Sequence, residues 1–410
     1  MQAGFAMLEV GSVSDTHTKD ILIKASGCHF AIMNLLDLAI AAVMWWSIGW
    51  GIAFGGDDAD DTPGPLSSNG EFFAKGQEFV DGEGYYGQEQ GYFWALWLFQ
   101  WSFSGTTVTI VSGAVGARIT MVGYVFFAQM MVGFIYPVVA RWGWSADGWA
   151  SPWSDTRDDL LFGCGAIDFA GSGIVHTTGG VAALVMIILL GPRINRFSVG
   201  AVDESKRQQS TVMQVLGAFL LWVGWYGFNG CSTLYLTGSS HVAAKAMACT
   251  TISAAAAGLG VTSASLVLFQ HVGTDEVMNG LLSGLVSISA CCAVVELEGA
   301  FFIGLVSAVN YLVSSRFIEM VHIDDMVDAS PVHLSNGIWG VIAAGLLTSK
   351  EAYSASYYAE RQDRCCGLLY GCGPNQLMAN LTMLVVIIIW AGSCSFLVGY
   401  FLKYTGSLRI

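Results

Sequence analysis

The chain has 410 residues, of which 54% are hydrophobic and 12% are charged, and its mean hydropathy is +0.57. Soluble proteins carry roughly 25% charged residues, so this composition argues against a soluble multidomain protein. The formal net charge of −14 is opposite to the basic surface that a nucleic-acid partner requires. Repeated apolar runs near the ~20 residues that cross a lipid bilayer predict an all-α polytopic membrane protein.

The apolar segments follow one another along the whole chain and predict a single membrane domain, residues 1–410. The first of them, residues 1–13 (MQAGFAMLEVGSV), is too short to span and lacks the basic start of a signal peptide. We therefore interpret it as the second half of a truncated first helix. Further spans are predicted, to make eleven transmembrane helices in all, at 28–54, 92–115, 120–140, 162–190, 211–231, 242–270, 279–295, 299–315, 333–348 and 376–402.

The loops between the spans predict an orientation. The loop 55–91 carries nine acids and one lysine, which is typical of a solvated loop. Eleven spans place the termini on opposite faces, and lysine and arginine are more frequent on the C-terminal side, with a tight cluster at 193–207. The positive-inside rule then predicts a cytoplasmic C-terminus, most naturally in the plasma membrane. The loop with Cys365, Cys366 and Cys372 falls outside, where both a disulfide and free thiols are open.

Two ionisable residues, Asp168 and His176, lie inside the apolar segment that runs to residue 190. Asp325 and His333 repeat their eight-residue spacing, and each histidine follows a valine and precedes a glycine by four residues. Ionisable groups inside a membrane span are expensive, so their default interpretation is functional. A lone histidine is more often a satisfied core residue, but two in related settings suggest a pair.

The two related segments lie five spans apart, which predicts two halves of opposite topology, at about residues 1–195 and 211–348. Inverted halves of this kind are typical of transporters whose sites form at the repeat interface. The last helix, 376–402, would then lie outside the repeat.

Five phrases occur in order along the chain: MQAGFAMLEVGSV, NLLDLAIAA, DFAGSGIVHTTGG, GWYGFNGCS and DDMVDASPVHLSNGIWG. Together they resemble the ammonium transporter family (Amt/Mep/Rh) over essentially the whole length, and its Amt/Mep branch in particular. The resemblance implies a homotrimer in the lipid bilayer with one pore through each subunit. It also implies transport of ammonium or ammonia, with methylammonium as an analogue. No nucleophile, metal or nucleotide motif stands out in the sequence, so neither enzymatic activity nor a cofactor is expected.

The resemblance assigns an outer site and a gate. Trp144 and Ser232, with Phe103, match the residues that recruit ammonium, since an indole face attracts a cation and a hydroxyl accepts a hydrogen bond. Phe103 and Phe228 match a stacked pair that closes the outer mouth. Asp168 matches an aspartate that orders the outer site without touching substrate. Trp142 competes with its neighbour for the recruiting role.

The pore residues follow from the same resemblance. His176 and His333 match the family's pore histidines, whose rings can share a hydrogen bond and fix each other's tautomers. Trp225 is expected to line the pore beside them. Of Asp325 and Asp328, one is expected to cap the helix that carries the second histidine.

Ammonium would be held at the outer site, lose a proton near the phenylalanine gate and pass as ammonia along the histidines. An ammonium sensor (transceptor) that uses the same site is an alternative, and so is a Rhesus-like gas channel, although Trp144 and Ser232 disfavour the latter. In the family, the first helix begins before the position of Met1 and the cytoplasmic tail continues past Ile410. The resemblance therefore implies a fragment, and a P-II-type regulator only where a longer tail exists.

Overall fold

The computed structural model describes residues 1–12, 24–55, 72–74, 88–153, 159–198 and 210–410. Most of the acidic loop predicted at 55–91 and part of the basic cluster at 193–207 lie outside these residues. The described residues are almost entirely helical, and no strand is assigned to them beyond an isolated bridge between Ile119 and Arg409. The predicted all-α class is confirmed.

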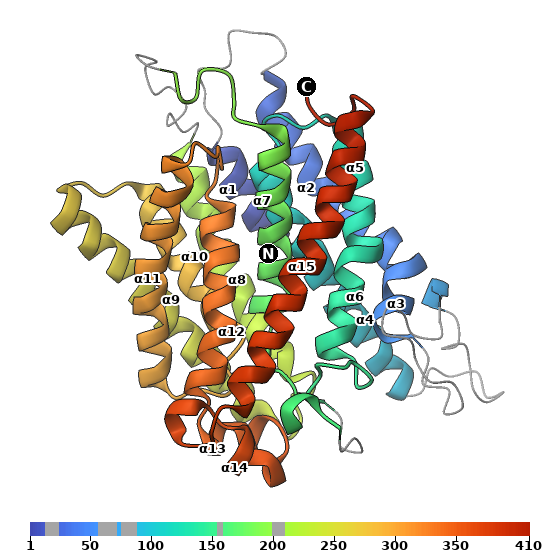
Figure 1. Cartoon of the computed structure of the whole chain (residues 1–410), viewed down its shortest axis with the longest axis vertical. Helices are drawn as coiled ribbons and strands as arrows, with labels where there is room; N and C mark the ends of the chain where they lie inside the picture. Colours follow the sequence, from blue (N-terminus) through green and yellow to red (C-terminus); the bar gives the residue numbers. More distant parts are fainter. Residues whose placement is uncertain (13–23, 56–71, 75–87, 154–158, 199–209) are drawn as a thin grey trace.

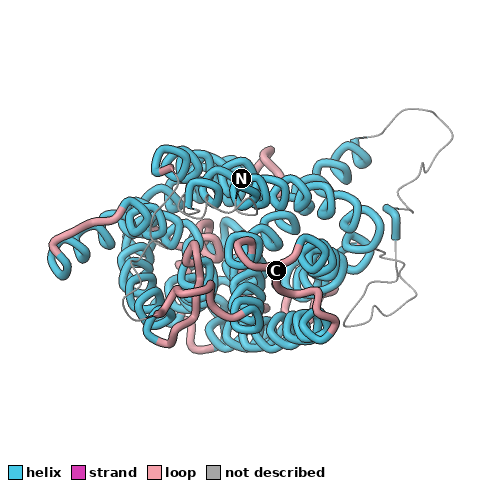
Figure 2. The backbone as a smooth tube through the Cα atoms, turned by 90° about the horizontal axis from the view of Figure 1, so that it is seen from above, coloured by secondary structure: helices cyan, strands magenta, loops and turns pink. Residues whose placement is uncertain are grey.

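The long helices run side by side (Figure 1) and form an elongated bundle when viewed from above (Figure 2). Seven helices or continuous helical runs in the described residues are long and apolar enough to cross a membrane. The count of eleven spans stays a prediction. The main helices are α1 (Gln2–Ser12), α2 (Lys24–Met44), α3 (Trp50–Phe54), α4 (Gln88–Val115), α5 (Met121–Met130), α6 (Tyr136–Trp144), α7 (Thr178–Leu190), α8 (Thr211–Gly230), α9 (Ser240–Phe269), α10 (Thr274–Ile288), α11 (Leu297–Met320), α12 (Asn336–Leu347), α13 (Lys350–Ser356), α14 (Gln362–Cys365) and α15 (Asn375–Tyr404).

Two predicted spans are interrupted in the structure. The segment 162–190 becomes a continuous helix only from Ser172, after Gly171 adopts a φ of 98°. The segment 279–295 ends its helix at Ile288. The irregular stretches meet each other, because the backbone N–H groups of Phe169 and Ala170 donate to the carbonyls of Ala290 and Ser289 at 2.9 and 2.8 Å. Non-helical backbone is tolerated inside a membrane protein when its polar groups are satisfied within the protein, as these are.

The two histidine-bearing helices begin alike. Each opens with a π-helical segment, η6 (Ser172–Thr177) before α7 and η9 (Ser330–Ser335) before α12. Gly180 and Gly337, four residues after each histidine, lie where these helices cross. A Cβ atom at Gly180 would come within 2.5 Å of the Leu334 nitrogen, and one at Gly337 within 2.5 Å of the Ser172 carbonyl oxygen. Glycine therefore permits the close crossing.

An ion cluster lies at the end of the bundle near the C-terminus. Asp324, in the loop between α11 and η9, pairs with Arg118 at 2.6 Å and with Arg193 at 2.8 Å. Burial alone would raise the pKa of Asp324, but the Arg193 and Arg118 guanidinium groups hold it below its usual value. The cluster ties the loop before η9 to the ends of α4 and α7.

Two disulfides lie at the opposite end, beside α13 and α14. Cys366 bonds to Cys372, within the loop where a disulfide was left open. Cys365 bonds to Cys164, which lies 201 residues earlier in the chain and was not predicted as its partner.

Candidate functional site

Six aromatic rings form a continuous column through the bundle. The ring centroids of Trp144 and Phe103 are 5.2 Å apart. Those of Phe103 and Phe228 are 4.1 Å apart with 37° between the ring planes, so the pair expected to be stacked is tilted. The column continues from Phe228 to His176 at 5.7 Å and from His176 to His333 at 5.2 Å. Phe5 of α1 ends it, 6.1 Å from His333. The structure thus places five predicted site residues in successive ring contacts and adds Phe5, which was not predicted.

The two histidines face each other through their Nδ1 atoms, which are 3.2 Å apart. One nitrogen must donate and the other accept, so each ring fixes the tautomer of its partner. Both side chains are buried, and His176 Nε2 has no hydrogen-bond partner among the described residues. Because a buried polar atom without a partner is costly, this nitrogen is suited to a small polar guest.

Trp225 supports His176 from the side. Its ring stacks on that of His176 at 5.3 Å, with 15° between the planes. Its indole N–H donates to Ser289 Oγ at 2.9 Å, which fixes the orientation of the ring. Trp225 therefore lies beside the column at the level of His176.

Asp168 connects the Trp144 end of the column to η6. Its carboxylate accepts the backbone N–H groups of Gly173 and Ile174 at 3.0 and 2.7 Å and that of Gly171 at 3.2 Å. Its carbonyl oxygen accepts the indole N–H of Trp144 at 2.7 Å. The aspartate thus holds both the half-buried indole and the start of the helix that carries the first histidine.

Ser232 contacts a residue of the column, whereas Trp142 packs on tryptophans outside it. Ser232 lies in η8 (Cys231–Thr233) directly after α8, and its hydroxyl donates to the Phe228 carbonyl at 2.7 Å. Trp142 packs on Trp149 and Trp390, with ring centroids 6.0 and 5.5 Å away. Of the two competing tryptophans, Trp144 is the one against the phenylalanine pair.

Of the two aspartates predicted as alternative caps, Asp325 is the one that caps η9. Its carboxylate accepts the backbone N–H groups of Ala329 and Ser330 at 3.0 and 2.7 Å. Asp328 instead accepts hydrogen bonds from the hydroxyls of Tyr311 and Ser315 at 2.8 and 2.9 Å. Asp325 is therefore the structural counterpart of Asp168 in the second histidine segment.

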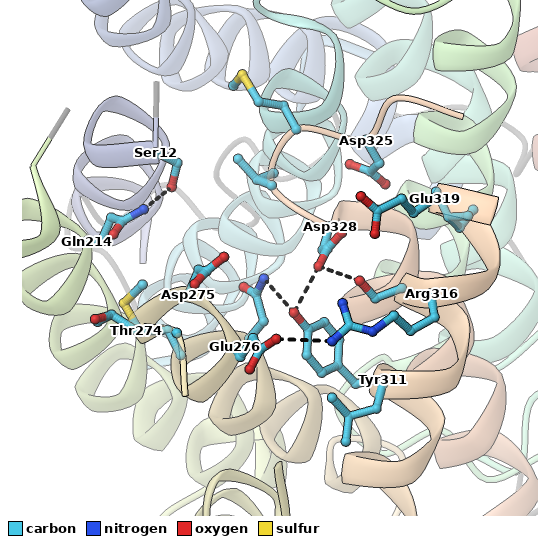
Figure 3. A pocket seen from close by; sticks show the side chains of 18 of the residues that line it. Ser12, Gln214, Thr274, Asp275, Glu276, Tyr311, Arg316, Glu319, Asp325 and Asp328 are labelled. Carbon is cyan, nitrogen blue, oxygen red and sulfur yellow. Dashed lines mark hydrogen bonds and ion pairs between the residues drawn. The ribbon is translucent and has the colours of Figure 1, made fainter. Parts of the chain in front are cut away.

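Two cavities follow the column beyond His333. A small one of about 20 Å³ lies against Phe5, Glu9 and His333. A larger one of about 570 Å³ shares Leu8, Asn279 and Val327 with it. Figure 3 shows charged and polar side chains around the larger cavity, including the hydrogen bond from Tyr311 to Asp328. Sequence reasoning predicted neither cavity.

The chain is similar to ammonium transporters along its whole length. The profile of the Ammonium Transporter Family matches residues 1–410. Ammonium transporter 1 member 2 from Oryza sativa subsp. japonica is 36% identical over 416 residues, which cover 98% of this chain and 77% of that protein. Ammonium transporter 1 member 1 from Arabidopsis thaliana is 35% identical over 417 residues, with the same shares.

Solved structures agree in fold. The structure titled Sensor Amt Protein superposes with a TM-score of 0.81 at 26% identity and covers 100% of this chain and 91% of that one. Mep2 from Candida albicans superposes with a TM-score of 0.79 at 22% identity, covering 100% and 84%. The chain therefore belongs to the ammonium transporter family, whose members are membrane transporters and not enzymes.

Proposed function

We propose that this chain moves ammonium across the membrane by releasing its proton at an outer site and passing ammonia along the histidine pair. The observation that carries the proposal is the ring column from Trp144 to His333, with a buried unpartnered nitrogen on His176 inside it. Trp144, Ser232 and Phe103 recruit the ion, and Phe103 with Phe228 forms the gate. His176, His333 and Trp225 line the path, and Asp168 supports the outer site.

Physical chemistry explains the selectivity of such a path. The Phe103 and Phe228 side chains are 1% and 4% exposed, so an ion between them loses its water. Stripping water from an intact cation costs far more than a ring face returns, which is about 2 kcal/mol for a desolvated site. Ammonium avoids this cost because it can leave its proton behind, whereas potassium has no proton to lose.

The assembly and orientation follow the same proposal. The protein forms a homotrimer in the plasma membrane, each subunit has its own pore, and the end bearing the C-terminus faces the cytoplasm. The outer site then lies at the end of the bundle where α13 and α14 lie (Figure 1).

The decisive experiment measures methylammonium and ammonium uptake by the purified protein in liposomes, with current recorded alongside. The wild type should take up both ions and reject potassium. His176→Ala should change the uptake rate or the rejection of potassium without loss of the fold. His241→Ala, an exposed histidine at the start of α9, is the matched control and should behave as wild type. Wild-type uptake and selectivity in His176→Ala would refute the assigned role.

A sensor is the second candidate, favoured by the likeness to the structure titled Sensor Amt Protein. The same liposome experiment separates the transporter from both alternatives. Saturable ammonium binding without flux would identify a sensor, whereas unsaturable ammonia flux without current would identify a Rhesus-like gas channel.

A further inference from the structure

Two carboxylates are buried side by side at the inner end of the column. Glu9 of α1 and Asp37 of α2 are 1% and 0% exposed. Glu9 accepts hydrogen bonds from Asn34 Nδ2 at 2.6 Å and from Ser112 Oγ at 3.1 Å. Asp37 accepts them from the Tyr124 hydroxyl and from Thr109 Oγ1, the latter at 3.2 Å. All four donors are neutral, and no cation pairs with either carboxylate among the described residues.

Burying Glu9 and Asp37 near each other is unfavourable when both carboxylates are charged. The donors Thr109 and Ser112 lie three residues apart on α4, so a single turn of that helix contacts both acids. Two neighbouring carboxylates in a medium of low polarity cannot both ionise without a large cost, and they hold one proton between them. Asp37 and Glu9 therefore store a proton inside the bundle.

The stored proton lies beside the path. Glu9 lines the cavity of about 20 Å³ together with His333. Gly113 helps to keep this space open, because a Cβ there would lie 3.1 Å from Glu9 Oε1 and 2.9 Å from Val327 Cγ2. His333 uses Nδ1 to meet His176, which leaves its Nε2 on the other side of the ring. The cavity is about large enough for one small polar molecule.

We propose that Glu9 is the proton donor that turns ammonia leaving His333 back into ammonium. The proton moves from the Glu9 carboxyl group to the nitrogen lone pair of ammonia, which leaves ammonium and a carboxylate. Water in the larger cavity then returns a proton to the carboxylate and becomes hydroxide, or hydronium becomes water. The ionisable groups that face Glu9 are Asp37 from α2, Tyr124 from α5 and His333 from η9. This inference rests on the proposed function of the pore.

The test is Glu9→Gln, which keeps the size of the side chain and an acceptor for Asn34 but carries no acidic proton. Liposomes with a pH indicator inside receive an ammonium gradient, and the initial rate is followed across pH. Loss of a general acid should slow the rate by about tenfold or more and flatten its dependence on pH. Glu9→Asp should recover part of the rate. Glu296→Gln, which removes a carboxylate paired with Lys245 away from the column, should match the wild type.

An infrared spectrum gives a readout independent of transport. The wild type should show the carbonyl stretch of a protonated carboxylic acid that is absent from Glu9→Gln and altered in Asp37→Asn. Adding ammonia should reduce this band. A Glu9→Gln rate equal to that of the transporting wild type would overturn the inference and leave the proposed function standing. A wild type without transport would instead overturn the proposed function. If Glu9→Gln does not fold, absence of the acid band from the wild-type spectrum would overturn the inference.

Discussion

Asp168 acts through two chemically different groups, and this decides what its substitution does. The carboxylate satisfies backbone N–H groups at the start of η6, which have no partner inside the helix. The backbone carbonyl holds the Trp144 indole, and a side-chain substitution leaves that acceptor in place. The residue therefore affects the Trp144 indole through the position of its backbone, which the carboxylate fixes.

Asp168→Asn should lower stability and weaken recruitment together. The amide has one acceptor oxygen where the carboxylate has two, and its NH₂ group would face backbone donors. We expect a loss of about 1–3 kcal/mol and a several-fold rise in the half-saturation concentration. Thermal unfolding and liposome uptake measure the two effects. Asp325→Asn, which removes the equivalent cap from η9, should lower stability but leave the half-saturation concentration unchanged. Equal half-saturation values in both variants would contradict the supporting role.

Residues whose chemistry contrasts with their surroundings were predictable from sequence. His176 and Asp168 are ionisable residues in an apolar run, and their repeat around His333 marks them further. Phe103 was not distinctive among 23 phenylalanines and required the family resemblance. Glu9 carries the same ionisable signal as the histidines, but its segment is too short to be recognised as a complete membrane span.

At the scale of helices, the crossing of η6–α7 with η9–α12 brings the two histidines together. The crossing is close because Gly180 and Gly337 present no side chain to the partner helix. Small residues are what allow membrane helices to approach at this distance. The spacing of four residues places each glycine about one turn beyond its histidine, so the same crossing fixes the distance between the rings.

Gly180→Ala and Gly337→Ala should each disturb this crossing. The added Cβ would meet backbone atoms at 2.5 Å, which cannot move without shifting a helix. Overpacking of this kind should cost about 1–3 kcal/mol and reduce transport, because the histidine rings move apart. Gly227→Ala in α8 is the control, since nothing lies within 4 Å of its Cβ position. Thermal unfolding and uptake should leave that control at or above the wild type, and equal losses in all three would contradict the packing argument.

Helix positions were predictable wherever the apolar run and the helix coincide. The predicted span 376–402 corresponds to Asn375–Tyr404, and 211–231 corresponds to Thr211–Gly230. The prediction failed at 162–190 because hydropathy does not distinguish a helix from buried irregular backbone. There the chain bends at Asp168–Gly171 and satisfies its polar groups against residues 289–290, a contact that only the fold reveals.

At the scale of the whole molecule, the two ends of the bundle are tied by different chemistry. The Arg118–Asp324–Arg193 cluster links loops at the end near the C-terminus. At the other end, the Cys164–Cys365 disulfide joins the segment that leads to Asp168 with α14. Asn380 of α15 adds to this tie, since its amide bonds both the N–H and the carbonyl of Ile167 at 2.9 and 3.0 Å.

The two disulfides should differ in their effect because they close loops of different length. Cys164–Cys365 spans 201 residues and Cys366–Cys372 spans 6. Loop-closure entropy gives the long link about 5 kcal/mol and the short one about 2 kcal/mol. The variant Cys164→Ser with Cys365→Ser should therefore unfold at a lower temperature than Cys366→Ser with Cys372→Ser.

The Cys164→Ser, Cys365→Ser variant should also show a higher half-saturation concentration, since the released segment carries the Asp168 backbone that holds Trp144. A reductant should lower the unfolding temperature of the wild type to that of the Cys164→Ser, Cys365→Ser variant or below it. Equal unfolding temperatures for the two variants would show that the Cys164–Cys365 disulfide does not constrain the chain. An unchanged half-saturation concentration would show that this disulfide does not affect ammonium recruitment.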